Sequence, residues 1–209
     1  MEIVAATNNK GKMAEFERIL QPLGFKILTL DALGFDGDIE ETGQTFEENA
    51  FIKAFEVAER FKKPGLADDS GLCVDALNGE PGIHSARFGG AISNAQRPEK
   101  LLSLMEDVPD ERRTARFVCV LCFIDRPDEI SSFEQAKKSG KALFVRAERP
   151  GIVERSGKGI NGFGFDPIFS VCGKTIAEMT PHEKDAVSAR GAAIRDFALK
   201  MRELGKLWL

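Results

Sequence analysis

The chain has 209 residues, of which 43% are hydrophobic and 30% charged, and its formal net charge is −4 at pH 7. These values are ordinary for a globular protein large enough to bury a substantial core. No apolar run approaches the roughly 18 residues of a membrane span, and the N-terminus lacks signal-peptide order, so the sequence predicts a cytoplasmic protein. The negative charge argues against binding along a nucleic-acid backbone, but it leaves room for a small anionic ligand held by a few cations.

The N-terminal segment is typical of a strand, a polar loop and a helix. Residues 2–6 are mostly apolar, and Phe16, Ile19 and Leu20 have the spacing of one helical face. The loop between them consists of Thr7, Asn8, Asn9, Lys10, Gly11 and Lys12. A helix N-terminus with two lysines favours anions, so we predict a phosphate site here, although a solvated loop is the alternative. Residues 25–30 have the composition of the next strand.

A carboxylate-rich loop precedes the second helix. It covers residues 36–43 and includes Glu40. The helix is predicted to begin after Thr45, because Thr45 and Glu48 form a capping box. Asn49 and Lys53 lie one turn apart on a polar face of this helix. Such a face is usually solvated, but this helix lies between the acidic loop and the next acidic segment in the chain.

Residues 64–75 contain two adjacent carboxylates, Asp68 and Asp69, between apolar runs. We interpret the segment as a strand, an acidic turn at Ser70 and Gly71, and a second strand. Neighbouring side chains on a strand point to opposite faces, so only one aspartate is expected to face a site, and we favour Asp69. A carboxylate at a strand end suits a hard cation such as Mg²⁺. The alternative is a simple β-turn, because Asp, Ser and Gly all favour turns.

The middle of the chain is predicted to contain a helix and several strands. Residues 93–105 have helical spacing, and residues 113–124 form the strongest strand pattern in the chain. Residues 130–136 and 142–147 are predicted to pair as a hairpin, with a further short strand at 150–154.

A glycine-rich segment, residues 157–162, matches the pattern G-x-G-x-x-G. It is not a dinucleotide fingerprint, because the Gly and Pro residues that follow are hostile to a helix. We interpret residues 161–167 as a loop that presents Phe163, Phe165 and Asp166 to a base by stacking and hydrogen bonding. Packing of both rings in the core is the alternative.

The C-terminal segment carries a second capping box, formed by Thr180 and Glu183, and then a core-facing helix. Lys184 and Arg190 would lie roughly 120° apart on an uninterrupted helix. Ser188 and the glycine at 191 offer a break, and only a break lets both cations converge.

Together these segments resemble the inosine triphosphate pyrophosphatase family, whose members hydrolyse ITP, dITP and XTP. The resemblance runs essentially from end to end. It rests on six motifs: T-x-N-x-x-K-x-x-E-F from Thr7, E-E-T-G-x-T-F-x-E-N-A-x-x-K-A from Glu40, A-D-D-S-G-L from Ala67, G-I-x-S-A-R from Gly82, G-F-G-F-D-P from Gly162 and S-A-R-G from Ser188.

The resemblance implies a single domain, residues 1–209, of α/β class: an elongated mixed β-sheet flanked by helices, in two lobes with a central cleft. It implies that residues 7–12 and Lys53 bind phosphate, and that Glu40 and Asp69 bind Mg²⁺. Asp69 would also be the catalytic base. The residues implied to contact the rest of the nucleotide are Ser70, Phe163, Gly164, Phe165, Asp166, Lys184, Ala189 and Arg190.

The implied reaction is Mg²⁺-dependent hydrolysis of a non-standard purine nucleoside triphosphate to the monophosphate and pyrophosphate, by a homodimer. Two positions depart from the family pattern: Ala189 replaces a common His, and Phe165 replaces a common Tyr. The first change bears on base selectivity. A Maf-type nucleotide pyrophosphatase is an alternative, but its entry motif S-x-S-x-x-R is absent; a nucleotide-binding module without turnover is another.

Overall fold

The computed structural model describes residues 1–205, which form a mixed sheet with flanking helices. The strands in this range are β1 (Glu2–Ala5), β2 (Lys26–Leu28), β3 (Gly65–Val74), β4 (Thr114–Ile124), β5 (Ala142–Val153), β6 (Phe169–Val171) and β7 (Lys174–Thr175). Their order in the sheet is β2-β1-β3-β4-β5-β6-β7. β1 is parallel to both β2 and β3, whereas β6 is antiparallel to β5 and β7. The predicted α/β class with a mixed sheet is confirmed.

The α-helices of the described range are α1 (Lys10–Leu20), α2 (Phe46–Phe61), α3 (Gln96–Leu104), α4 (Phe133–Ser139), α5 (Pro181–Val187) and α6 (Ala189–Glu203). None of these helices is long and apolar enough to cross a membrane. The chain divides into two compact units, the first made of Met1–Asp69, Cys119–Arg146 and Ala193–Leu209, and the second of Ser70–Val118 and Ala147–Ala192.

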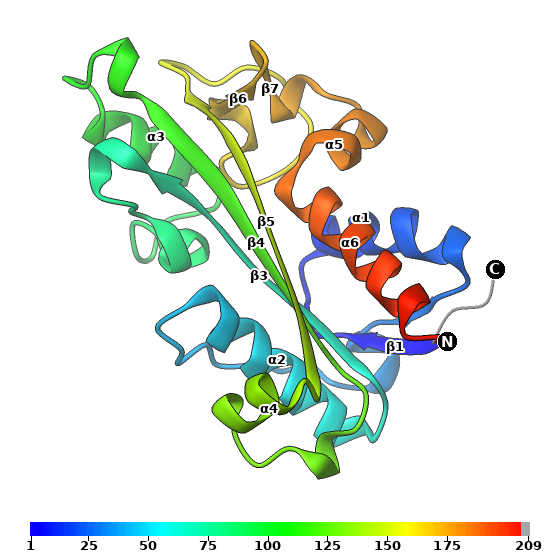
Figure 1. Ribbon diagram of the computed structural model, residues 1–209. Helices are drawn as coiled ribbons and strands as arrows, with labels where there is room; N and C mark the ends of the chain where they lie inside the picture. The colour runs from blue at the N-terminus through cyan, green and yellow to red at the C-terminus, as the bar shows by residue number, and fades with distance from the viewer. Residues whose placement is uncertain (206–209) are drawn as a thin grey trace. The chain divides into compact units, whose positions relative to one another are not determined.

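In the first unit, helices pack on both sides of the strands. Figure 1 shows α1 and α6 on one side and α2 and α4 on the other. The ring of Phe197 on α6 lies 5.8 Å from that of Phe25 and 5.4 Å from that of Phe123 on β4. On the other side, Phe51 of α2 makes an edge contact with Phe133 of α4, with centroids 5.5 Å apart. These apolar contacts pack the helices of the first unit against each other and against β4.

The second unit has its own hydrophobic core, which includes Leu72, Leu101, Met105, Ile168 and Phe169. A buried arginine spans it. Arg113, 3% exposed, donates from its guanidinium to the carbonyls of Met105, Val153 and Glu154 at 2.7 to 2.9 Å. Because buried carbonyls need donors, this one side chain ties the end of α3 to β5.

The local signals for helix ends are confirmed. Thr45 and Glu48 form the capping box that starts α2, and Thr180 and Glu183 form the one that starts α5. α5 ends at Ser188, whose backbone is extended, and α6 begins at the next residue. The predicted break is therefore present.

Two sequence predictions were wrong. Residues 68–71 form no turn, because β3 runs without interruption from Gly65 to Val74. Gly71 serves close packing instead: a Cβ there would lie 2.1 Å from the carbonyl oxygen of Gly82. The first strand of the predicted hairpin is also absent, since residues 133–139 form α4, which Ser132 caps by accepting from the backbone N–H of Gln135.

The region after α4 differs from the prediction as well. Residues 142–153 form one long strand, β5, so the expected separate strand at 150–154 is its end. The N-capping serine was a local signal for the helix, but apolar residues at 130 and 133 also suit a strand, and this ambiguity is common in short segments.

Candidate active site

Asp69 is a buried carboxylate that accepts a hydrogen bond on each of its two oxygens. It is 5% exposed and lies in the middle of β3. Lys53 of α2 donates to one carboxylate oxygen at 3.1 Å, and Asn49, one turn earlier, donates to the other at 3.3 Å. The Asn49 amide is itself oriented, because its oxygen accepts from the backbone N–H of Gly43 at 2.8 Å. The polar face of α2 noted in the sequence is thus directed at Asp69.

A second carboxylate, Glu41, shares Lys53 with Asp69. The Lys53 ammonium lies 2.6 Å from Glu41. Burial raises the pKa of Asp69 above its ordinary value and Glu41 raises it further, whereas Lys53 and Lys12 act in the opposite direction. Burial alone would lower the pKa of Lys53, but the carboxylates of Asp69, Asp68 and Glu41 outweigh it and raise that pKa. Lys53 therefore stays charged, and Asp69 is a stronger base than an ordinary aspartate.

Asp68 faces the other helix layer. Its carboxylate lies 3.1 Å from the ammonium of Lys12 on α1. Adjacent residues on a strand point to opposite faces, and here each aspartate has a lysine partner on a different helix. Asp68 thereby holds Lys12 at the first turn of α1.

The predicted phosphate loop forms the N-cap of α1. The side chain of Asn9 accepts from the backbone N–H groups of Gly11 and Lys12 at 2.9 and 3.1 Å. Thr7 accepts from the N–H of Asn9, and the amide of Asn8 donates to the carbonyl of Gly37. Two of the N–H groups expected to bind an anion are therefore already bonded to Asn9. What the loop offers an anion is mainly Lys12, the exposed side chain of Lys10 and the Thr7 hydroxyl.

The donor set in this unit suits a magnesium ion that keeps water and substrate as ligands. Within residues 1–205, no three His, Cys, Asp or Glu side chains gather to hold a metal ion. Two carboxylate oxygens, from Glu41 and Asp69, do lie within 3.1 Å of one ammonium. Glu40, the ligand implied by the resemblance, is exposed and adjacent to Glu41 in the chain. Mg²⁺ typically uses one or two carboxylates plus phosphate oxygens and waters, so these residues fit it.

The second unit gathers two cations on one aromatic ring. The Lys184 ammonium lies 4.2 Å from the centre of the Phe163 ring, and the guanidinium carbon of Arg190 lies 5.5 Å from it. Asp166 accepts from Lys184 at 2.7 Å and from the backbone N–H of Phe163 at 2.8 Å. Arg190 donates to the Ser70 hydroxyl at 2.7 Å. The break before α6 does bring both cations to one place.

The remaining predicted residues of this unit have different environments. Phe165 is 4% exposed and belongs to the core, where its ring lies 6.0 Å from that of Phe88. The sequence-based expectation that this ring stacks on a base is therefore replaced by its alternative, core packing. Gly164 has a φ of +61°, which favours glycine, and Ala189 is buried at the first residue of α6.

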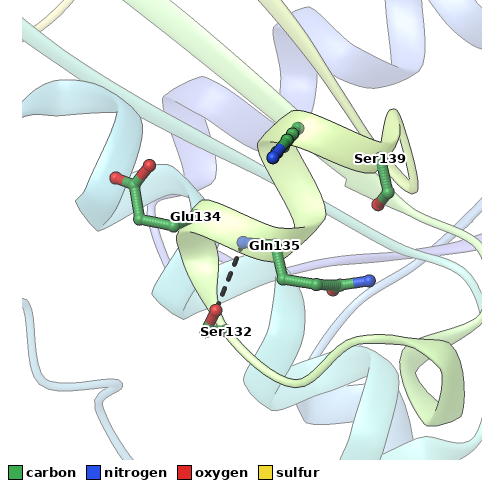
Figure 2. A pocket seen from close by; sticks show the side chains of 5 residues that line it. Ser132, Glu134, Gln135 and Ser139 are labelled. Carbon is green, nitrogen blue, oxygen red and sulfur yellow. Dashed lines mark hydrogen bonds between the residues drawn. The ribbon is translucent and has the colours of Figure 1, made fainter.

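A surface hollow elsewhere in the first unit contains none of these residues. Figure 2 shows it at α4, lined by Ser132, Glu134, Gln135, Lys138 and Ser139. Its lining residues belong to α4 and to Ser132, the N-cap of that helix.

The Ham1 family model matches residues 3–200 of the chain. The chain belongs to the Ham1 family. A dITP/XTP pyrophosphatase of Halalkalibacterium halodurans is 45% identical over 197 residues, which are 93% of this chain and 95% of the relative. A protein of the same name from Escherichia coli K12 is 43% identical over 197 residues, covering 93% of this chain and 94% of that protein.

Solved Ham1 structures agree with this assignment. A HAM1 protein from Coxiella burnetii matches with a TM-score of 0.83 at 38% identity, covering 97% of this chain and 99% of that chain. The Ham1 protein of Staphylococcus aureus matches with a TM-score of 0.80 at 36% identity, over 97% and 99% of the two chains.

Sequence reasoning overlooked Glu41 and the contact between Ser70 and Arg190. A signal for Glu41 was present, because it is the second residue of the E-E-T-G motif. The Ser70 contact joins residues 120 positions apart and had no local signal.

Proposed function

We propose that this protein hydrolyses non-standard purine nucleoside triphosphates (dITP, XTP and ITP) to the monophosphate and pyrophosphate. The observation that carries the proposal is the buried Asp69, whose two carboxylate oxygens accept from Lys53 and Asn49. A carboxylate with fixed geometry and a raised pKa is suited to orient water and take its proton. The names of the relatives supply the substrate class.

The first unit would bind the phosphates. Lys12 and Lys53 are cations held by carboxylates in defined positions, at 3.1 Å from Asp68 and from Asp69 respectively. A triphosphate adds negative charge beside these carboxylates, and fixed cations stabilise the charge that develops in the transition state. Thr7 and Lys10 would add contacts at the start of α1.

Asp69 would hold a Mg²⁺ ion together with Glu41 or Glu40, and phosphate oxygens would complete its ligands. When bound, the ion supplies charge neutralisation at the phosphates. The role of Asp69 toward water needs a lone pair that is not taken by Lys53 or Asn49. A carboxylate has about four acceptor sites, so such a lone pair is available by count.

The second unit would bind the base. Hypoxanthine and xanthine present a keto oxygen where adenine presents an amino group. The guanidinium of Arg190 consists only of donors, so it would favour hypoxanthine and xanthine over adenine. Guanine has the same keto oxygen, so the low turnover expected for GTP does not depend on Arg190. Phe163 would stack on the base, and Lys184 would contact the nucleotide from the other side of the break.

Arg190→Ala should therefore reduce the preference for dITP over dATP, by roughly 1–3 kcal/mol in transition-state binding. Ala189→His, which restores the common family residue, should change this preference little. The measurement is kcat/KM for both nucleotides on both variants. A large gain in selectivity from Ala189→His would show that base selection depends on position 189, and it would contradict the assignment to Arg190.

A substrate panel tests the function itself. ITP, dITP, XTP, ATP and GTP should be incubated with Mg²⁺, and both pyrophosphate and orthophosphate should be measured. We expect pyrophosphate as the first product from the non-standard purines and little turnover of ATP or GTP. Orthophosphate as the first product, or binding without turnover, contradicts the proposal. Loss of activity with a chelator and its return with Mg²⁺ tests the metal.

The homodimer implied by the family resemblance remains a proposal. Light scattering after size-exclusion chromatography would test it, and a single species at 22.9 kDa would contradict it. We expect the enzyme in the cytoplasm, where a nucleoside triphosphate pool is available to it.

A further inference from the structure

The buried amide of Asn49 joins the carboxylate-rich loop before α2 to Asp69. Asn49 is 0% exposed and lies near the start of α2. Its side-chain oxygen accepts from the backbone N–H of Gly43 at 2.8 Å, and its NH₂ group donates to Asp69 at 3.3 Å. If the amide were reversed, its NH₂ would face the N–H of Gly43 and its oxygen would face a carboxylate. The two partners therefore fix the orientation of the amide.

The loop can reach Asn49 because residue 43 is glycine. A Cβ at this position would lie 2.7 Å from the side-chain oxygen of Asn49 and 2.6 Å from the Cβ of Glu48, which is closer than real Cβ atoms approach. Glu48 holds the next two residues of the chain, since its carboxylate accepts from the backbone N–H groups of Gln44 and Thr45. Two side chains of α2 thus attach the end of the loop, and Asn49 extends this attachment to Asp69.

The carboxylate plane of Asp69 is held by donors from two successive turns of α2. Lys53 donates to one oxygen and Asn49 to the other. The torsion that sets the plane of an aspartate carboxylate has no sharp preference of its own, so hydrogen bonds decide it. The ammonium of Lys53 is on a flexible stem and can follow a rotating carboxylate. The short side chain of Asn49, whose oxygen is bonded to Gly43, restrains that rotation.

We propose that Asn49 is a positioning residue for the hydrolysis: it fixes the plane of the Asp69 carboxylate, so that a lone pair of this base is directed at the attacking water. The proposal rests on the proposed function and deepens it, because the family resemblance implies no role for Asn49. Lys12 and Lys53 keep their carboxylate partners when Asn49 is changed, so nucleotide binding should persist. Loss of Asn49 should therefore lower kcat and leave KM nearly unchanged.

A double-mutant cycle tests whether Asn49 acts through Asp69. Pyrophosphate release from dITP is measured at saturating Mg²⁺ for Asn49→Ala, Asp69→Asn and the double variant. Asn49→Ala should lower kcat roughly 10- to 100-fold, the value of a hydrogen bond to a charged group, and change KM by less than about threefold. In the Asp69→Asn background it should lower kcat by less than about twofold, because the carboxylate that it orients is gone. The same fold loss in both backgrounds, or a loss confined to KM, would overturn the proposal.

Glu48→Ala is the matched control for loosening of the loop. It removes the other side chain of α2 that attaches the loop, and also one half of the capping box, so it should lower the melting temperature. Its kcat should stay within about threefold of the wild-type value, since Glu48 does not hold Asp69. A fall in kcat equal to that of Asn49→Ala would assign the effect to detachment of the loop and overturn the proposal.

Gly43→Ala tests the same link from the loop side and serves if Asn49→Ala does not fold. The added Cβ displaces the N–H that orients the amide, although Asn49 itself is retained. It should lower kcat for the wild-type carboxylate and not in the Asp69→Asn background. An unchanged kcat in folded Gly43→Ala would contradict the proposal. Calorimetric titration of each folded variant with dITP in the absence of Mg²⁺ should give an affinity close to that of the wild type, and a large loss of affinity would show that Asn49 acts on binding.

The wild-type enzyme distinguishes failure of this inference from failure of the function. If the wild type releases pyrophosphate from dITP, the function stands whatever Asn49→Ala does. If the wild type shows no such turnover, the proposed function fails first and this inference fails with it.

Discussion

Asp69→Asn is the perturbation that tests the proposed chemistry most directly, because it changes one charge and almost no volume. The native carboxylate accepts from two donors, Lys53 and Asn49. Lys53 and Asn49 donate to different carboxylate oxygens. An asparagine has one oxygen and one NH₂, so its oxygen can face only one of these two donors. Asn49 cannot reverse its amide without loss, because its oxygen already accepts from Gly43.

The effect on stability should be small because two terms oppose each other. Leaving one buried donor unpaired costs about 1–3 kcal/mol. Burial raises the pKa of Asp69, which means that its ionised form is disfavoured in the folded protein, and asparagine removes that cost. Lys53 also keeps Glu41 at 2.6 Å. We expect the free energy of unfolding to change by no more than about 2 kcal/mol.

The effect on activity should be large. Loss of a positioned base lowers kcat by about 10²-fold or more, which corresponds to about 2.7 kcal/mol in the activation barrier. Asp68→Asn is the matched control: it is the same substitution on the neighbouring residue, but it affects Lys12 on α1. It should act mainly on KM, with kcat reduced by less than about tenfold.

The assay is pyrophosphate release from dITP over a range of Mg²⁺ concentrations, with thermal unfolding of each variant measured in parallel. Saturating Mg²⁺ separates a loss of metal affinity from a loss of the base. Similar, mild losses for both variants, or a normal kcat for Asp69→Asn at saturating Mg²⁺, would refute the assignment.

Three further predictions concern the fold around the site. Hydrogen bonds from Thr180 and Lys174 lower the pKa of Glu183 from 4.5 to about 2, so the stability that the ionised side chain contributes is present above pH 4.5 and is lost as pH falls through 2. Glu183→Gln should lower the melting temperature at pH 7 and by much less at pH 2, as differential scanning calorimetry would show. Gly71→Ala should lower the free energy of unfolding by about 1–3 kcal/mol, because the added Cβ would lie 2.1 Å from the carbonyl oxygen of Gly82. Gly157→Ala is the control, because a Cβ there would have its nearest neighbour at 3.5 Å, and urea unfolding should show a much smaller effect for it. Arg113→Met should cost roughly 2–4 kcal/mol in urea unfolding, since several buried carbonyls lose their donor; an unchanged midpoint would contradict the role of this side chain.

The sequence by itself determined the features that depend on hydrogen bonds within a few residues. The capping boxes at Thr45 and Thr180 and the break at Ser188 all appeared where local patterns predicted them. Each involves groups within one helical turn, so the chain specifies them before distant segments meet. The opposite orientation of Asp68 and Asp69 followed in the same way from the geometry of a strand.

Tertiary structure decided what depends on distant neighbours. The Asp-Asp-Ser-Gly segment has turn composition, but β3 continues through it because the sheet supplies its partners and Gly71 allows Gly82 to approach. The identity of the carboxylate beside Lys53, Glu41, depends on how an irregular loop folds onto α2, and irregular loops carry no periodicity to read. The same holds for Ser70 and Arg190, since their contact joins residues 120 positions apart, on β3 and at the start of α6.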